Sequence, residues 1–144
     1  MTFEQLVTAA FQRADQLQEY WSFYATLVLA LLAFFASMKP EQRTIKLAAI
    51  ITIGFFAVSI ANLLALVDVS RQRLELQELL TRAAADDQSL VQLTHTITPS
   101  STQAVTLFHS AFDAFTLVAV WIMAVTTSDL QTLFRRAGKK RGGP

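Results

Sequence analysis

The sequence of 144 residues has no cysteine, only four glycines and three prolines, and charged residues make up just 16% of it. Soluble domains carry about 25% charged residues. The lack of cysteine excludes a disulfide-stabilised scaffold. The scarcity of charge excludes a soluble enzyme and a disordered chain, because both depend on abundant polar surface. Hydrophobic residues reach 53%, and they gather in long apolar segments.

Two segments without any charged residue are long enough to cross a bilayer. They run from Tyr20 to Met38 and from Leu47 to Val67, and about 20 apolar residues suffice for a span. A third apolar segment is interrupted by His109 and Asp113, yet its roughly 24 residues would span about 36 Å. The sequence therefore predicts an all-α integral membrane protein with transmembrane helices at 20–38, 45–67 and 104–127.

Apolar residues recur at helical spacing before the first span. They are Phe3, Leu6, Val7, Ala10, Phe11, Ala14 and Leu17. This stripe predicts an N-terminal amphipathic helix over 1–19, which lies on the membrane or packs on a neighbouring subunit. Residues 1–19 lack a basic start followed by an apolar core, so we expect no cleavable signal peptide.

The segment 68–103 predicts a helical extension of the second span to about residue 85, followed by a turn and cap at Thr98–Ser101 that begins the third span. The apolar face of this extension needs a partner, which is either the amino-terminal helix or another subunit. The segment is too short to fold alone, so we treat 1–144 as one membrane domain that ends in a basic tail, 128–144.

The charges outside the spans predict the orientation. The loop 39–46 has a net charge of +2 and the tail 128–144 one of +4, whereas 1–19 and 68–103 each have −2. Positive segments stay on the cytoplasmic side. We therefore expect a plasma membrane or bacterial inner membrane protein with its N-terminus outside and its C-terminus in the cytoplasm.

Motifs for catalysis and cofactors are missing from the sequence. There is no glycine-rich phosphate loop, no HExxH, no GxSxG and no cysteine pair, and there are only two histidines. We expect no enzymatic activity, no catalytic residue, no metal and no cofactor. The basic tail is explained by orientation and by attraction to anionic lipid rather than by nucleic acid.

Polar residues share one face of the third span. Within about 80° of a helical wheel lie Thr102, Thr106, His109, Asp113 and Thr116. Counted from the outer boundary, Tyr24, Asn62 and His109 lie roughly 6–8 Å deep, and Thr26, Ser59 and Asp113 roughly 9–14 Å deep. Tyr20, Trp21 and Tyr24 are interpreted as aromatic anchors at the membrane surface.

Asp113 is the only charged residue within the apolar segments 20–38, 47–67 and 104–127, and His109 lies one helical turn before it. Such a pair either satisfies itself and fixes helix packing, or forms a cation or proton site. Small residues in the spans, such as Ala57, Ala61 and Ala65, favour close helix contacts and assembly of several copies.

Two functional hypotheses follow. In the first, a homo-oligomeric cation or proton channel or transport subunit uses Asp113 and His109 as its ion site, in an outward-facing vestibule lined by Asn62, Ser59, Thr102, Thr106 and Thr116. In the second, a non-conducting accessory, assembly or immunity-type subunit binds another membrane protein. A third possibility is a membrane-permeabilising protein, since three spans with the N-terminus outside and a basic tail inside are similar to the topology of phage holins.

Overall fold

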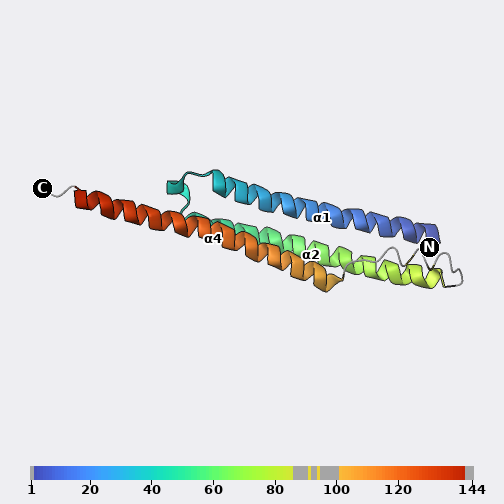
Figure 1. Cartoon of the computed structure of the whole chain (residues 1–144). Coiled ribbons are helices and arrows are strands. Elements are labelled where there is room, and N and C mark those ends of the chain that lie inside the picture. Colours follow the sequence, from blue (N-terminus) through green and yellow to red (C-terminus); the bar gives the residue numbers. More distant parts are fainter. Residues whose placement is uncertain (1, 86–90, 92–93, 95–100, 142–144) are drawn as a thin grey trace. The chain divides into compact units, whose positions relative to one another are not determined.

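Helices form the whole regular structure of the described residues in a computed structural model, which covers residues 2–85, 91, 94 and 101–141 and gives no side chains for 127–141. The elements are α1 (Phe3–Ser37), the short 3-10 helix η1 (Pro40–Gln42), α2 (Ile45–Ala83) and α4 (Thr102–Arg141) (Figure 1). The prediction of an all-α protein is confirmed for these residues. The predicted amphipathic segment and the first span belong to one continuous helix, α1.

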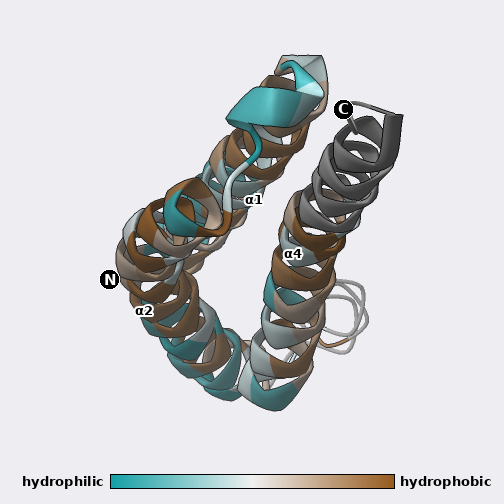
Figure 2. Cartoon of the chain, turned by 90° about the vertical axis from the view of Figure 1, so that its left-hand side faces the viewer, coloured by the Kyte–Doolittle hydropathy of each residue, from teal (hydrophilic) through white to brown (hydrophobic). Residues whose placement is uncertain are grey.

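Three helices are long and apolar enough to cross a membrane: Phe3–Ser37, Ile45–Ala83 and the part Thr102–Thr126 of α4. This confirms the number of predicted membrane helices. At 1.5 Å per residue, the 35 residues of α1 and the 39 of α2 extend over roughly 52 and 58 Å. A bilayer core is only about 30 Å thick, so both helices continue well beyond a span. The colours in Figure 2 follow this change, since α2 turns from brown to teal towards its C-terminal end.

Short polar side chains begin all three long helices. The hydroxyl oxygens of Thr2, Thr44 and Ser101 accept hydrogen bonds from backbone N–H groups three residues further on, at 3.3, 3.2 and 3.2 Å. In α1 the Gln5 side chain also accepts a bond of 2.9 Å from the Thr2 backbone, which completes a capping box. The predicted cap at Ser101 is confirmed, while Thr98–Ser100 lie outside the described residues.

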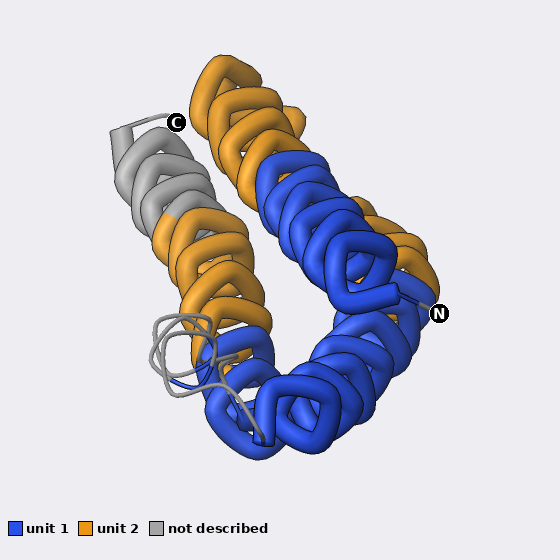
Figure 3. Tube along the Cα trace, turned by 90° about the vertical axis from the view of Figure 1, so that its right-hand side faces the viewer, with its two compact units in different colours: residues 1–24, 60–110 blue, residues 25–59, 111–144 orange. Residues whose placement is uncertain are grey.

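The chain divides into two compact units, and each long helix contributes to both (Figure 3). Unit 1 contains Met1–Tyr24 and Ile60–Ser110; unit 2 contains Ala25–Ser59 and Ala111–Pro144. The units are described separately below.

In unit 1, the apolar stripe of α1 packs on α2. Buried residues of the first cluster are Leu17, Leu66, Val69 and Val105, and those of the second are Leu6, Ala10 and Leu80. Phe3, Val7 and Leu76 pack around the second cluster. Most of the stripe therefore packs on this chain's own α2, so that the extension of α2 has the amino-terminal helix as a partner, while Phe11 of the stripe stays 58% exposed.

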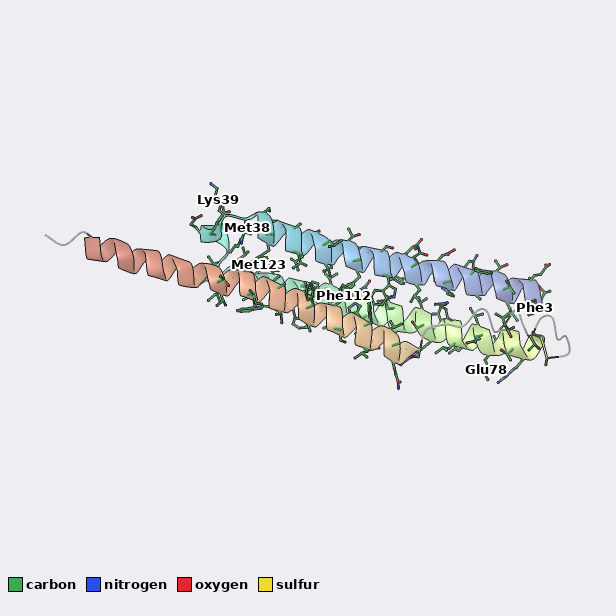
Figure 4. All side chains as sticks on the ribbon, viewed as in Figure 1. Phe3, Met38, Lys39, Glu78, Phe112 and Met123 are labelled. Carbon is green, nitrogen blue, oxygen red and sulfur yellow. The ribbon has the colours of Figure 1, made fainter. Side chains whose placement is uncertain are left out.

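In unit 2, the core joins all three long helices through a different kind of contact. Phe35 of α1 is fully buried against Ala48 of α2 and against Val120 and Ala124 of α4. Met38 and Met123, both labelled in Figure 4, belong to the partly buried residues around this cluster. Two of the four core residues are alanines, and such small residues let helix backbones approach closely.

Candidate functional site

The polar face of α4 turns towards the interior of the protein. His109 and Thr116 have no exposed surface, and Thr102, Thr106 and Asp113 are partly buried. Phe108, Phe112 and Phe115 of the same helix are more than 40% exposed. In a bilayer these phenylalanines meet lipid, so the polar groups are kept away from it, as the cost of exposing them to hydrocarbon requires.

His109 lies in unit 1 among side chains from all three long helices. Its ring stacks on Tyr24 of α1, with a distance of 4.1 Å between ring centroids and an angle of 29° between the planes. Its Nε2 lies 3.3 Å from the amide nitrogen of Asn62 on α2. The ring centroid of Trp21 lies 5.9 Å from that of the His109 imidazole. We call these four residues, Trp21, Tyr24, Asn62 and His109, the His109 cluster.

Three of the four residues of the His109 cluster are buried within unit 1, and Trp21 is partly buried. Tyr24 is 1% exposed, Asn62 6% and His109 0%. A histidine on the lipid face of a span would be exposed instead, so the imidazole is part of the protein interior. The predicted depths agree with this arrangement, because Tyr24, Asn62 and His109 were expected in the same layer.

Asp113 lies in unit 2 and is held by a serine of α2. The Ser59 hydroxyl, 1% exposed, donates a hydrogen bond of 2.7 Å to Oδ2 of Asp113. Hydroxyl–carboxylate bonds of this length are among the stronger hydrogen bonds in proteins. We call these two residues the Asp113 pair. They were also expected at similar depth, but the contact itself was not predicted, because the sequence interpretation paired Asp113 with His109.

The threonines of the polar face satisfy their hydroxyls within α4. Thr106 donates to the carbonyl oxygen of Thr102 at 2.9 Å, and Thr116 to that of Phe112 at 2.8 Å. A hydroxyl bonded in this way keeps an oxygen lone pair free to accept a second bond. These residues therefore stay candidates for the lining of a polar site, as predicted.

Tyr24 is the functional candidate that the sequence interpretation missed. It was interpreted as a surface anchor together with Tyr20 and Trp21, but its ring packs on His109. Tyr20 is 37% exposed and fits that anchoring role better. The signal for Tyr24 was its depth, equal to that of Asn62 and His109, and its position three residues after Trp21 on the inner side of α1.

The chemistry of the two groups differs. Asn62 can serve either protonation state of His109, because its amide nitrogen donates to an unprotonated Nε2 and its oxygen accepts from a protonated one after a turn of the amide. The carboxylate of Asp113 accepts from Ser59 and can hold a cation or a proton. Among residues 2–85, 91, 94 and 101–126, no three histidine, aspartate or glutamate side chains gather as metal ligands would.

Comparison of the chain with protein-family models, with curated proteins and with solved structures gives no match.

Proposed function

We propose that the protein is a proton or cation transport subunit of a plasma or bacterial inner membrane, with His109 and Asp113 as its ionisable residues. One observation carries this proposal. Both ionisable side chains of the third span face the protein interior, and each has a polar partner on α2, Asn62 for His109 and Ser59 for Asp113.

The physical argument starts from the cost of such groups. A carboxylate at the centre of a span costs about 2.5–3.5 kcal/mol on insertion scales, so spans contain such groups rarely and mostly in ion or proton pathways. Packing alone would be achieved at lower cost by apolar or small side chains. Two ionisable residues one helical turn apart, both turned inward, therefore favour a role in charge transfer.

The partners of the two residues suit a step that changes protonation. The Asn62 amide can bond to neutral or protonated His109, and the Tyr24 ring stacks on the imidazole and holds its orientation. Ser59 can rotate its hydroxyl, so that it donates to a charged Asp113 or accepts from a protonated one. In this proposal, water reaches the site from outside through a vestibule that includes Thr102 and Thr106.

The experiment measures flux in liposomes. Purified protein is reconstituted, and proton uptake is followed with an internal pH dye while a potassium gradient with valinomycin sets the voltage. We expect uptake well above that of empty vesicles. His109→Gln is expected to lower that uptake. Uptake equal to that of empty vesicles, for protons and for sodium or potassium, would contradict the proposal.

A second candidate, a non-conducting accessory subunit, is favoured by the closed packing of His109, which has no exposed surface. A polar cluster that only fixes the angle between helices would look the same. The contact surface would then be the charged extension of α2, where Arg71 and Glu78 are exposed. Charge reversal at these two residues should abolish co-purification of the other membrane protein and leave insertion intact.

A further inference from the structure

The packed parts of α1 and α2 in unit 1 bear a groove on one flank. It has a volume of about 250 Å³, and its lining residues are Ala9, Arg13, Gln72, Glu75, Leu76 and Leu79. Leu79 is 45% exposed although it lies in a segment rich in charge, outside the apolar part of α2. The lining thus combines apolar residues with two charged residues of opposite sign, Arg13 on α1 and Glu75 on α2.

The polar groups of the groove have unused bonding capacity. The Arg13 guanidinium donates a hydrogen bond of 2.6 Å to Oε1 of Gln16. Neither Arg13 nor Glu75 forms an ion pair with a described residue. The amide nitrogen of Gln72 donates a hydrogen bond of 2.8 Å to Oδ2 of Asp68. The Oε1 atom of Gln72 is buried and accepts no hydrogen bond from a described residue. By contrast, Glu78 does pair with Arg82 and points away from α1, as Figure 4 shows.

The two charged residues of the groove, Arg13 and Glu75, lie at the same height along the axis of the helix pair. The contacts that set the level join Leu6 and Ala10 to Leu80, and Leu17 to Leu66 and Val69. Since the helices run antiparallel, this places Arg13 beside Glu75. Copies of a chain inserted in a membrane share one orientation, so a two-fold axis between them lies along the membrane normal and each residue meets partner residues at its own level.

We propose that this groove is the interface between two copies of the chain. Under such a two-fold axis, Arg13 of one copy faces the partner's Glu75 and Glu75 faces the partner's Arg13, which is the self-complementary pattern that an isologous dimer requires. Leu76 and Leu79 of both copies then cover each other at the centre. The inference goes beyond the proposed function, because it concerns the segments outside the spans and does not depend on ion flux.

Cysteine cross-linking tests the position of the interface. The chain has no cysteine, so a single introduced thiol gives an unambiguous result. Leu79→Cys in native-like lipid is expected to form a disulfide-linked dimer on mild oxidation. The matched control is Thr81→Cys, also exposed but about 200° further around α2, which should stay monomeric on a denaturing gel. Equal cross-linking at both positions, or none at Leu79→Cys, would overturn the proposal.

Charge exchange tests the pairing itself on the cysteine-free chain. Arg13→Glu and Glu75→Arg each place like charges at two contacts per dimer, so each is expected to weaken dimerisation roughly tenfold in lipid dilution experiments. The double variant Arg13→Glu/Glu75→Arg restores opposite charges and should recover the wild-type dissociation constant. Failure of this recovery, with helicity unchanged by circular dichroism, would overturn the pairing. A wild-type chain that is monomeric at all dilutions would overturn the interface altogether. Neither result bears on the flux assay.

Discussion

Units 1 and 2 hold the same three helices together by different means. In the part of unit 1 formed by residues 3–17 and 68–83, α1 and α2 bury an apolar stripe while charged side chains lie on the outside, so packing there follows the rules of a soluble helix pair. In unit 2 the outer faces are apolar, with Ile50, Ile53 and Phe34 all more than half exposed. Burying more apolar surface gains little when lipid is the solvent, and unit 2 relies instead on close contacts of small residues and on hydrogen bonds between helices.

This difference separates the source of stability, which is apolar burial in unit 1, from the source of packing specificity, which is shape and polar contacts in unit 2. Water drives the helices of unit 1 together, so large aliphatic side chains such as Leu80 should carry its stability. In unit 2, shape and polar contacts decide which faces meet, as at Ala124 and at Ser59 with Asp113. Variants of these residues test the comparison directly.

The largest effect is expected from Leu80→Ala in unit 1. Leu80 has no exposed surface and packs on Leu6 and Ala10, so truncation should cost about 2–5 kcal/mol of local stability. Hydrogen exchange of backbone amides in 3–17 and 68–83 measures this loss. Leu74→Ala, at 39% exposure, is the control and should change protection little. Equal protection in both variants would mean that water does not hold this helix pair together.

A smaller effect is expected from overpacking unit 2 with Ala124→Leu. Ala124 is fully buried beside Phe35 and Ala48, and extra methylene groups in such a contact cost about 1–3 kcal/mol. The free energy of unfolding in mixed micelles measures it. Ala114→Leu on the exposed side of α4 is the control. If the two variants were equally stable, close helix approach would not be what holds unit 2.

The bond between Ser59 and Asp113 should contribute less. A double-mutant cycle with Ser59→Ala and Asp113→Ala is expected to give a coupling of about 0.6 kcal/mol and at most about 1.7 kcal/mol, the average and the maximum for hydrogen bonds between membrane helices. The same unfolding assay applies. A coupling of zero would show that the two groups do not interact in the folded protein.

The smallest effect is expected at the second bond between helices in unit 2. The indole nitrogen of Trp121 donates a hydrogen bond of 3.1 Å to the Thr52 hydroxyl near the surface of the helices. Thr52→Val combined with Trp121→Phe should show a coupling of about 0.5 kcal/mol. A value above that of Ser59 with Asp113 would reverse the ranking of these two contacts.

Much of this architecture was predictable because hydrophobic patterns encode it. The apolar runs predicted the three spans, and the stripe from Phe3 to Leu17 predicted the face of α1 that packs. The polar face of α4 indicated which side turns inward. The sequence placed Asn62 and His109, and likewise Ser59 and Asp113, at similar depths, but it did not predict their contacts.

Other contacts could not be predicted, and the reason is physical. The segments of unit 2 are apolar all round, so periodicity gives them no inner face, and the contact of Phe35 with Val120 has no signal in the sequence. Tyr24 was missed because an amphipathic ring fits a membrane surface and a buried cluster equally well. The continuity of α1 was not predicted either, since its amphipathic and apolar parts suit two different environments.

The most direct test of the proposed charge-transfer site is proton and cation flux in liposomes that contain Asp113→Asn. Asparagine keeps an oxygen that can accept the Ser59 bond, so the fold should persist while the ionisable group is lost. Asp15→Asn, which removes an exposed carboxylate of α1, is the matched control. We predict that Asp113→Asn abolishes the flux and that Asp15→Asn retains it. Wild-type flux through Asp113→Asn would contradict the site.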